Sequence, residues 1–136
     1  MPLVLEIVTP EEKVYEETID TVVLPTTSGE ISVLPGHIPL VTELDPGELQ
    51  VTVQNKTDLL VVGRGFARIE GDRVSVLAES AIEEAKIDES AVEEALKRAQ
   101  DALSDQAALN PADVDQLEGV MRYAMAQLAA KQRRRK

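Results

Sequence analysis

The sequence predicts a mainly β fold with an added α part: an N-terminal antiparallel β-sandwich followed by a C-terminal antiparallel hairpin of two helices. Up to residue 78, short β-branched runs alternate with turn residues at intervals of about 8 to 12 positions. Six of the seven glycines lie in residues 1–84, whereas alanine, glutamate, lysine and leucine dominate the remainder. We therefore divide the chain into residues 1–84 and residues 85–136, and we expect the first part to fold alone.

The first part contains nine runs with the composition of strands. In residues 49–54 and 73–77 apolar and polar side chains alternate, which places one face on a core and the other in water. Residues 59–62 are apolar on both faces, as in a central strand. Turn residues separate the runs, among them a turn at 55–56, and residues 71–72 form a two-residue loop suited to a tight hairpin. The predicted strands are 3–9, 13–16, 19–24, 30–34, 38–44, 48–54, 58–62, 66–70 and 73–78.

The second part contains the starts of two predicted helices, each with a recognisable N-cap. Asp88 is the expected N-cap of the first helix, and Asn110 followed by Pro111 is the expected start of the second. Each helix has about 17 to 20 residues and is marginal alone in water, so the hairpin must pack on the sandwich or on another protein. A weakly docked switch and a permanently packed hairpin fit the pattern equally well. The apolar stripes are Val92, Leu96, Ala99, Leu103 and then Val114, Leu117, Met121, Ala124, Leu128.

The charge is divided unevenly between the two parts. The net charge is −11; residues 1–84 hold 5 Lys/Arg against 16 Asp/Glu, whereas residues 85–136 hold 9 of each. An acidic sandwich repels nucleic acid and anionic lipid, so neither is an expected partner. There is no cysteine, which excludes disulfides and thiolate metal sites. The longest apolar run has four residues, so we expect no membrane insertion.

The densest cluster of unusual residues is the segment 29–42, Gly-Glu-Ile-Ser-Val-Leu-Pro-Gly-His-Ile-Pro-Leu-Val-Thr. As chemistry alone it predicts a strand, a tight turn at Pro35 and Gly36, and an exposed loop with the only histidine, His37. An acid–base pair of His37 with Glu30 is the competing interpretation. No nucleophile or set of metal ligands accompanies them, so we expect neither catalysis nor a metal site.

This segment closely resembles the Gly-Glu-Ile-x-Val-Leu-Pro-Gly-His-x-Pro-Leu signature of the epsilon subunits of bacterial F-type (rotary) ATP synthases. Two further matches follow in order. Residues 65–69 resemble the Gly-Gly-Phe segment of that family, and residues 74–81 resemble the strand that closes its sandwich. The resemblance spans essentially the whole chain, including the helical ending.

The resemblance implies a non-catalytic rotor subunit of the central stalk, peripheral on the cytoplasmic face of the bacterial plasma membrane or on the equivalent thylakoid face. It implies a sandwich that binds the gamma subunit and the membrane ring of c subunits, with contact residues Glu30, Pro35, Gly36, His37 and Ile38. It also implies a hairpin that extends into the catalytic head of alpha and beta subunits and inhibits ATP hydrolysis. The expected inhibitory contacts are Arg122, Arg133, Arg134 and Arg135.

The chain departs from the family pattern at two positions. Arg64 stands where the family usually has the first of two glycines, so a glycine-only backbone conformation is not expected there. Some epsilon subunits bind ATP through Ile-Asp-x-x-Arg-Ala, and this chain has Ile87 and Asp88 but Ala91 in place of the arginine. Without that phosphate-binding fork we predict little affinity for ATP, no cofactor, and a helix-cap role for Asp88.

Two other interpretations of function stay open at this stage. One is a free-standing β-sandwich binding module with a helical oligomerisation hairpin. The other is a small nucleotide-sensing regulator. The basic ending, with five cations in the last six residues, has three interpretations: a solvated tail, nucleic-acid binding, which the acidic sandwich and the scarcity of aromatic residues disfavour, and, as the resemblance implies, a contact with acidic loops of the catalytic subunits.

Overall fold

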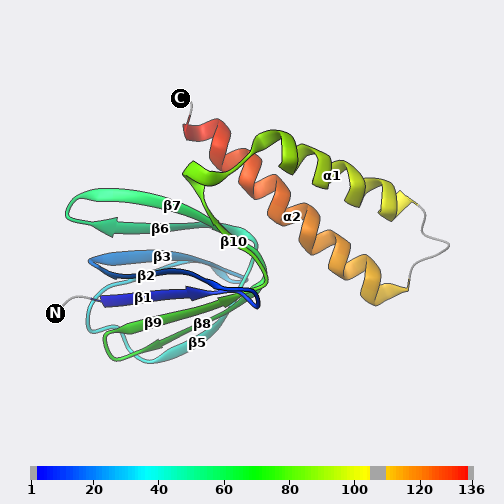
Figure 1. Ribbon diagram of the computed structural model, residues 1–136. Coiled ribbons are helices and arrows are strands. Elements are labelled where there is room, and N and C mark those ends of the chain that lie inside the picture. The colour runs from blue at the N-terminus through cyan, green and yellow to red at the C-terminus, as the bar shows by residue number, and fades with distance from the viewer. Residues whose placement is uncertain (1–2, 105–109, 135–136) are drawn as a thin grey trace.

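The structure is a computed structural model that describes residues 3–104 and 110–134, with the side chain of Arg134 left out (Figure 1). Its described part contains ten strands, one 3-10 turn and two helices. The strands are β1 (Leu3–Val8), β2 (Lys13–Ile19), β3 (Thr21–Thr26), β4 (Gly29–Val33), β5 (Leu40–Leu44), β6 (Gly47–Val53), β7 (Lys56–Val62), β8 (Gly65–Glu70), β9 (Arg73–Ala78) and β10 (Ala81–Glu83). The turn η1 (Glu84–Lys86) leads into α1 (Glu89–Ser104) and α2 (Pro111–Arg134).

The strands form one strongly curled sheet in the order β10-β7-β6-β3-β5-β8-β9-β1-β2, with β4 paired to the other edge of β3. All pairings are antiparallel except that of β1 with β9, where Leu5 lies opposite Val74. Figure 1 shows β6 and β7 facing β8 and β9 across the interior. The curled sheet therefore makes the predicted sandwich.

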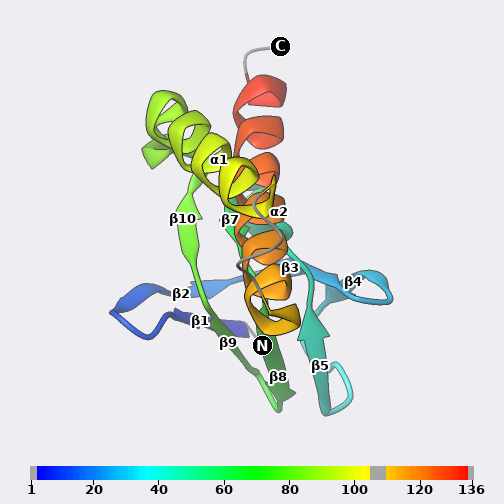
Figure 2. The same cartoon turned by 90° about the vertical axis from the view of Figure 1, so that its right-hand side faces the viewer.

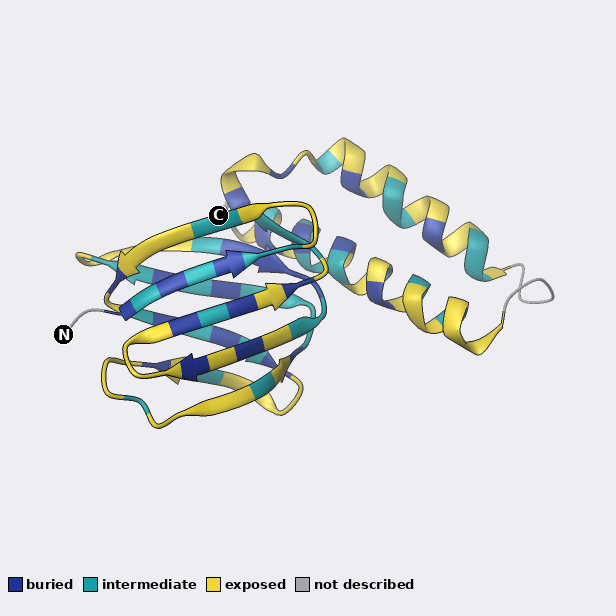
Figure 3. Ribbon diagram, turned by 60° about the horizontal axis from the view of Figure 1, so that its bottom comes forward, coloured by how far each residue is buried: buried dark blue, intermediate teal, exposed yellow. Residues whose placement is uncertain are grey.

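The core between the two layers is entirely aliphatic. Alternate residues of the strands point into it, as the banding of buried and exposed positions in Figure 3 shows. Its fully buried members are all aliphatic and Tyr15 packs only at the margin, which explains how a chain with three aromatic residues still closes a core. The buried members are Leu3, Leu5, Ile7, Ile19, Val22, Leu24, Val33, Leu44, Leu49, Val51, Leu60, Val62, Ala67, Ile69, Val74, Val76 and Ala78.

The start of β8 depends on a glycine. A Cβ at Gly65 would lie 1.9 Å from the carbonyl oxygen of Leu77, so only a residue without a side chain lets β8 approach β9 there. Arg64 precedes it and has an ordinary negative φ, since the described non-glycine residues with positive φ are Gln54 and Asn55. The expectation that Arg64 needs no glycine conformation is confirmed.

The predicted sandwich and helical hairpin are confirmed, with local differences. The strand expected from residue 38 begins at Leu40. The turn expected at 55–56 is formed instead by Gln54 and Asn55, because their left-handed conformation matches the twist of a two-residue hairpin. Strand β10 was not predicted; its three residues pair with the end of β7 and are too few to give a periodic pattern.

Both predicted helix caps are present. The Asp88 carboxylate accepts a hydrogen bond from the backbone N–H of Ala91 at 3.3 Å. The Asn110 side chain accepts one from the N–H of Asp113 at 2.9 Å. Helix α2 packs on β6, β7 and η1, while α1 packs mainly on α2. In Figure 2 α2 accordingly lies against the end of the sandwich and α1 beside it.

Substitution of Gly65 tests the close approach of β8 and β9. Gly65→Ala should lower the free energy of unfolding by about 3 kcal/mol, because its methyl group meets backbone that cannot move aside. Urea denaturation followed by circular dichroism measures this. The matched control is Gly63→Ala, whose Cβ would have its nearest contacts at 3.6 to 3.7 Å and should change stability by less than about 1 kcal/mol. Equal stability of the two variants would contradict the assigned packing.

Candidate contact surfaces

The first candidate surface is the loop between β4 and β5. Gly36 takes a φ of +84°, and the N–H of His37 donates to the carbonyl oxygen of Leu34 at 3.1 Å, which closes a tight turn. Nδ1 of His37 lies 2.7 Å from the carbonyl oxygen of Ile38. The ring is thus engaged with its own loop rather than with Glu30, which is exposed on β4. The side chain of Ile38 is 74% exposed, so an apolar tip projects into solvent.

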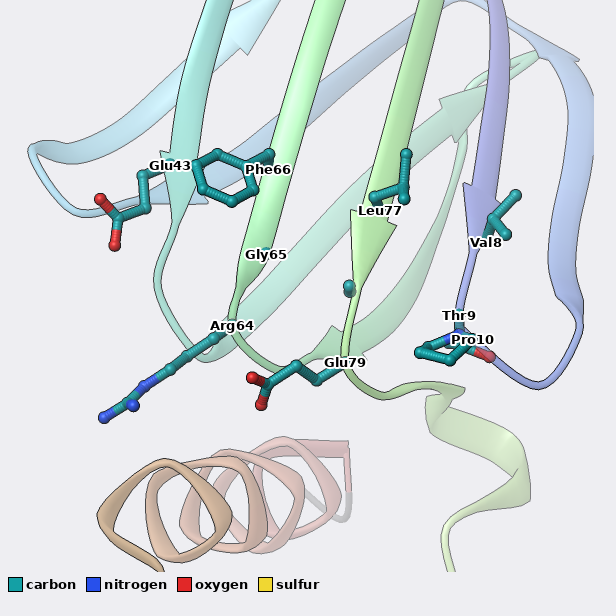
Figure 4. Close-up of a pocket in the computed structure, with 10 residues that line it drawn as sticks. Val8, Thr9, Pro10, Glu43, Arg64, Gly65, Phe66, Leu77 and Glu79 are labelled. Atoms are coloured by element: carbon teal, nitrogen blue, oxygen red, sulfur yellow. The ribbon is translucent and has the colours of Figure 1, made fainter. Parts of the chain in front are cut away.

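The second surface is an apolar patch on the outer face of the layer formed by β5, β8, β9 and β1. Phe66, Leu77 and Val8 lie side by side in register across three strands (Figure 4). Phe66 is 59% and Leu77 64% exposed. A hollow of about 510 Å³ runs along the row, and exposed Val41 lies on the same face of β5, two residues before Glu43, which is the β5 neighbour of Phe66. We call Val8, Val41, Phe66 and Leu77 the outer-face patch.

The loop surface and the hairpin occupy opposite ends of the sandwich. Leu40, which leaves the loop, pairs with Ile69 near the turn between β8 and β9. Arg64 and Gly65 lie at the other end of β8, and there the chain faces α2 (Figure 4). The sandwich therefore separates two surfaces by the length of its strands.

The third surface is the interface that holds α2 against the sandwich. Val61 of β7 is fully buried beneath Ile87, Ala124 and Ala130, and Tyr123 packs at the edge of this cluster. Small alanines let α2 lie close to the sheet, but they also bury little apolar area. The apolar contribution to docking is accordingly modest.

Four ion pairs line the same interface. Arg64 Nη1 lies 2.8 Å from Asp115 Oδ2, and Arg122 donates to Asp45. Arg133 lies 2.5 Å from a Glu48 carboxylate that is only 10% exposed, and Lys131 lies 3.8 Å from Glu84. In three of these pairs the cation is on α2 and the carboxylate on the sandwich or η1, whereas the pair of Arg64 with Asp115 has the reverse polarity.

Ile87 and Asp88, the two residues that match the start of the nucleotide-binding motif considered above, both have structural roles. Ile87 is 5% exposed and belongs to the apolar cluster under α2. The Asp88 carboxylate caps α1 through Ala91. Both side chains thus serve the hairpin, which supports the predicted helix-cap role of Asp88.

The structure brings some predicted contact residues together and leaves others outside its scope. Pro35, Gly36, His37 and Ile38 form one loop, with Glu30 on the strand before it. Arg122 and Arg133 face the sandwich; the side chain of Arg134 and all of Arg135 lie outside the described residues. Sequence reasoning missed the outer-face patch. The alternation along β8 could have predicted it. Ala67 and Ile69 point into the core, so Phe66, which precedes Ala67, must point outward.

Two kinds of site are absent from the described ranges 3–104 and 110–134. No group of three or more acidic or histidine side chains is arranged to hold a metal ion. Neither helix, over its described residues, is long and apolar enough to span a membrane.

Comparison with known proteins decides the family. The family described as ATP synthase, Delta/Epsilon chain, beta-sandwich domain matches residues 2–84. ATP synthase epsilon chain 2 of Ralstonia nicotianae is 39% identical over 138 residues, covering 100% of this chain and 98% of its own. The chain belongs to the delta/epsilon chain family of ATP synthases. The ATP synthase epsilon chain of Carboxydothermus hydrogenoformans is 44% identical over 100 residues, 74% of this chain and 75% of its own.

Solved structures agree with this family. A chain in the Euglena gracilis mitochondrial ATP synthase, solved as OSCP/F1/c-ring, superposes with a TM-score of 0.74 at 26% identity, covering 95% of this chain and 81% of that one. A chain of the Tetrahymena thermophila central stalk and c-ring has a TM-score of 0.60 at 12% identity, covering 96% and 97%, and shares the fold. As a member of the family, the chain is an epsilon-type subunit of an ATP synthase, a membrane-associated complex.

Tyr123 provides a spectroscopic test of docking. Burial raises the pKa of Tyr123 to about 12 from the ordinary value of 10.0. Because this folded-state value lies above the unfolded one, the contribution of the neutral phenol is complete below about pH 10 and is lost as the pH rises towards 12. Absorbance titration of a Tyr15→Phe variant, in which Tyr123 is the only tyrosine, should have a midpoint near pH 12.

The control for this titration disrupts the interface. Val61→Asp places a carboxylate under α2 and should lower the Tyr123 midpoint towards 10. A midpoint near 10 in the Tyr15→Phe variant itself would mean that α2 leaves Tyr123 in water and that the described interface is wrong.

Proposed function

We propose that the chain is the non-catalytic central-stalk subunit that couples the gamma subunit to the ring of c subunits. The observation that carries the proposal is the outer-face patch. The sandwich core of this family member is closed, yet Phe66 and Leu77, two large apolar side chains, stand exposed beside a hollow. Contiguous apolar surface of this kind is typical of a protein interface. Its partner in this proposal is the gamma subunit.

The loop around His37 is the proposed contact with the c-ring. It includes Glu30, Pro35, Gly36, His37 and Ile38, and combines an exposed apolar tip with polar groups at the end of the sandwich opposite the hairpin. A rotor joint needs a stiff complementary surface rather than reactive groups. The antiparallel sheet between patch and loop supplies that stiffness, since each strand is fixed by neighbours on the hydrogen-bonding ladder.

The hairpin is the proposed regulator of ATP hydrolysis. Docked, α2 pairs its cations with sandwich carboxylates. Extended as one arm, residues 88–131 would span roughly 65 Å at about 1.5 Å per residue, which is long enough to carry Arg122, Arg133, Arg134 and Arg135 to acidic loops of the alpha and beta subunits. The same cations then have two alternative anionic partners, and this makes a two-state element.

Two further parts of the proposal concern organisation and place. Residues 1–84 form the coupling unit and fold alone, which is supported by the match of the family to residues 2–84. The subunit lies on the side of the membrane that carries the catalytic head, the cytoplasmic face in a bacterium or the equivalent thylakoid face. ATP is not a ligand in this proposal, because Ala91 offers no phosphate donor where the related motif has arginine.

Charge on the outer-face patch should abolish gamma binding. In the variant Phe66→Asp with Leu77→Asp, two carboxylates replace the apolar anchors, and desolvating them on association is unfavourable. Copurification with coexpressed tagged gamma should fall at least about tenfold. The matched control is Thr57→Asp, an exposed position on β7 in the other layer. Retention of gamma by the double variant would contradict the assigned face.

Removing the cations and removing a sandwich carboxylate should change the rate of ATP hydrolysis in opposite directions, and this distinguishes the two proposed partners of the cations. Changing Arg133, Arg134 and Arg135 together to Ala should raise ATP hydrolysis by the assembled enzyme, because the extended arm loses three proposed anionic contacts, which outweighs the loss of the docked pair of Arg133 with Glu48. Glu48→Gln removes a carboxylate used only in the docked state and should lower hydrolysis. Exposed pairs are worth about 0.2–1 kcal/mol each, or about 1.4- to fivefold per pair, so the loss of two or more pairs together is expected to change hydrolysis by about twofold or more.

Salt dependence completes this test. Added salt should bring the rate of the wild-type enzyme towards that of the triple alanine variant, because screening acts on the same contacts. If the triple variant and Glu48→Gln shift hydrolysis in the same direction, or if neither differs from wild type at low salt, the regulatory role of the tail is wrong. Assembly of each variant with gamma serves as the control for folding.

A further inference from the structure

Helix α2 has a glycine in its interior that the helix itself does not need. Gly119 is the ninth residue of α2 (Pro111–Arg134) and is buried. Glycine in a helix interior is less favourable than alanine by about two- to fivefold in the helix equilibrium. Something outside the helix must therefore use the missing side chain.

That neighbour is Arg64. A Cβ at Gly119 would lie 3.0 Å from both Cζ and Nε of Arg64 and 3.3 Å from Nη1. The guanidinium lies across α2 where the glycine leaves a notch, and its side chain is only 27% exposed. Asp115 stands one turn before Gly119 on the same helix face, and its Oδ2 accepts from Arg64 Nη1 at 2.8 Å.

The base of Arg64 is fixed by the sheet. Its carbonyl oxygen accepts a hydrogen bond from the N–H of Glu79 at 2.8 Å. The next residue, Gly65, lies against the backbone of Leu77. In Figure 4 the side chain leaves the sandwich and points at α2. The backbone of Arg64 is therefore fixed, and its guanidinium is held in place by the pair with Asp115.

We propose that Arg64, Asp115 and Gly119 form a latch that holds α2 on the sandwich and fixes its register. This pair sets the register because its polarity is reversed, with the cation on the sandwich and the carboxylate on α2. Along α2 the helix presents Asp115 and then Arg122, while the sandwich presents Arg64 and then Asp45. Sliding α2 by two turns would place Asp115 opposite Asp45, two like charges, so only one alignment satisfies both pairs.

Gly119 acts on both sides of the docking equilibrium. In the docked state it makes room for the guanidinium of Arg64. In a released α2 without that neighbour, it only weakens the helix. Glycine at position 119 is thus favourable in the docked state and unfavourable in the released state. The latch therefore biases the chain towards docking. Its consequence for ATP hydrolysis rests on the proposed regulatory function, whereas the latch itself is a property of the chain alone.

The test is amide hydrogen exchange of the full chain, read at the amides of α2 from 120 to 130. Replacing a glycine in a helix interior by alanine ordinarily slows amide exchange, because alanine is the better helix former. Here Gly119→Ala should speed exchange by about threefold or more, because the methyl group would lie 3.0 Å from Cζ and Nε of Arg64, and the guanidinium must shift from the position in which it pairs with Asp115. In an Arg64→Ala background the same substitution should slow exchange, and this reversal of sign isolates the coupling of the two residues.

Charge provides the second arm of the test. Asp115→Asn should speed exchange of these amides by about 1.4- to fivefold. Glu118→Gln is the matched control, since Glu118 is exposed on the same helix and should leave exchange unchanged. Amides of β8 report folding of the sandwich and should stay protected in every variant.

The outcomes separate the latch from the regulatory function. If Gly119→Ala slows exchange in the wild-type background, or Asp115→Asn behaves as Glu118→Gln does, the latch is wrong. If the exchange pattern follows the prediction but ATP hydrolysis of the assembled enzyme is the same for wild type and Gly119→Ala, the latch stands and the inhibitory role of the hairpin fails.

Discussion

The close approach of Gly65 to the backbone of Leu77 governs the placement of both functional sides of the sandwich. It brings β8 against β9 at the hairpin end. From that point the strand sends Phe66 outward to the apolar patch, while Arg64, one residue before the glycine, reaches α2. Two surfaces that face different neighbours therefore share one short segment. A change in the seating of β8 would disturb the patch and the docked hairpin together.

The interface of α2 with the sandwich combines little apolar burial with four ion pairs. Alanines supply close packing, and the pairs are partly exposed, apart from the carboxylates of Glu48 and Glu84, which are 10% and 6% exposed. Exposed pairs contribute little individually, so such an interface holds a helix in place without holding it irreversibly. Since α1 packs chiefly on α2 rather than on the sandwich, release of α2 would take α1 with it. The two helices are expected to leave the sandwich as one unit.

Much of this architecture could be predicted from local pattern alone. Alternation located the strands, and Asp88 and Asn110 marked the helix starts because a cap needs only its own neighbours. Strand β10 escaped prediction because three residues paired to β7 carry no period of their own. The partners of Arg64 and Arg122 lie 51 and 77 positions away, and no local rule assigns them. The resemblance located the loop at His37, but only the register of β1, β8 and β9 gathers Val8, Phe66 and Leu77 into one patch.

Because the two parts carry unequal charge, the electric dipole moment of the molecule would depend on whether the hairpin is docked or extended. Docking sets the cations of α2 beside the carboxylates of an acidic sandwich, so opposite charges are close and the dipole moment is small. Extension would carry the basic tip away from the acidic body and lengthen the dipole along the arm. An anionic lipid surface repels the acidic end and an acidic protein surface attracts the basic one, so the field of a membrane-bound assembly would orient the extended chain with its tip away from the bilayer.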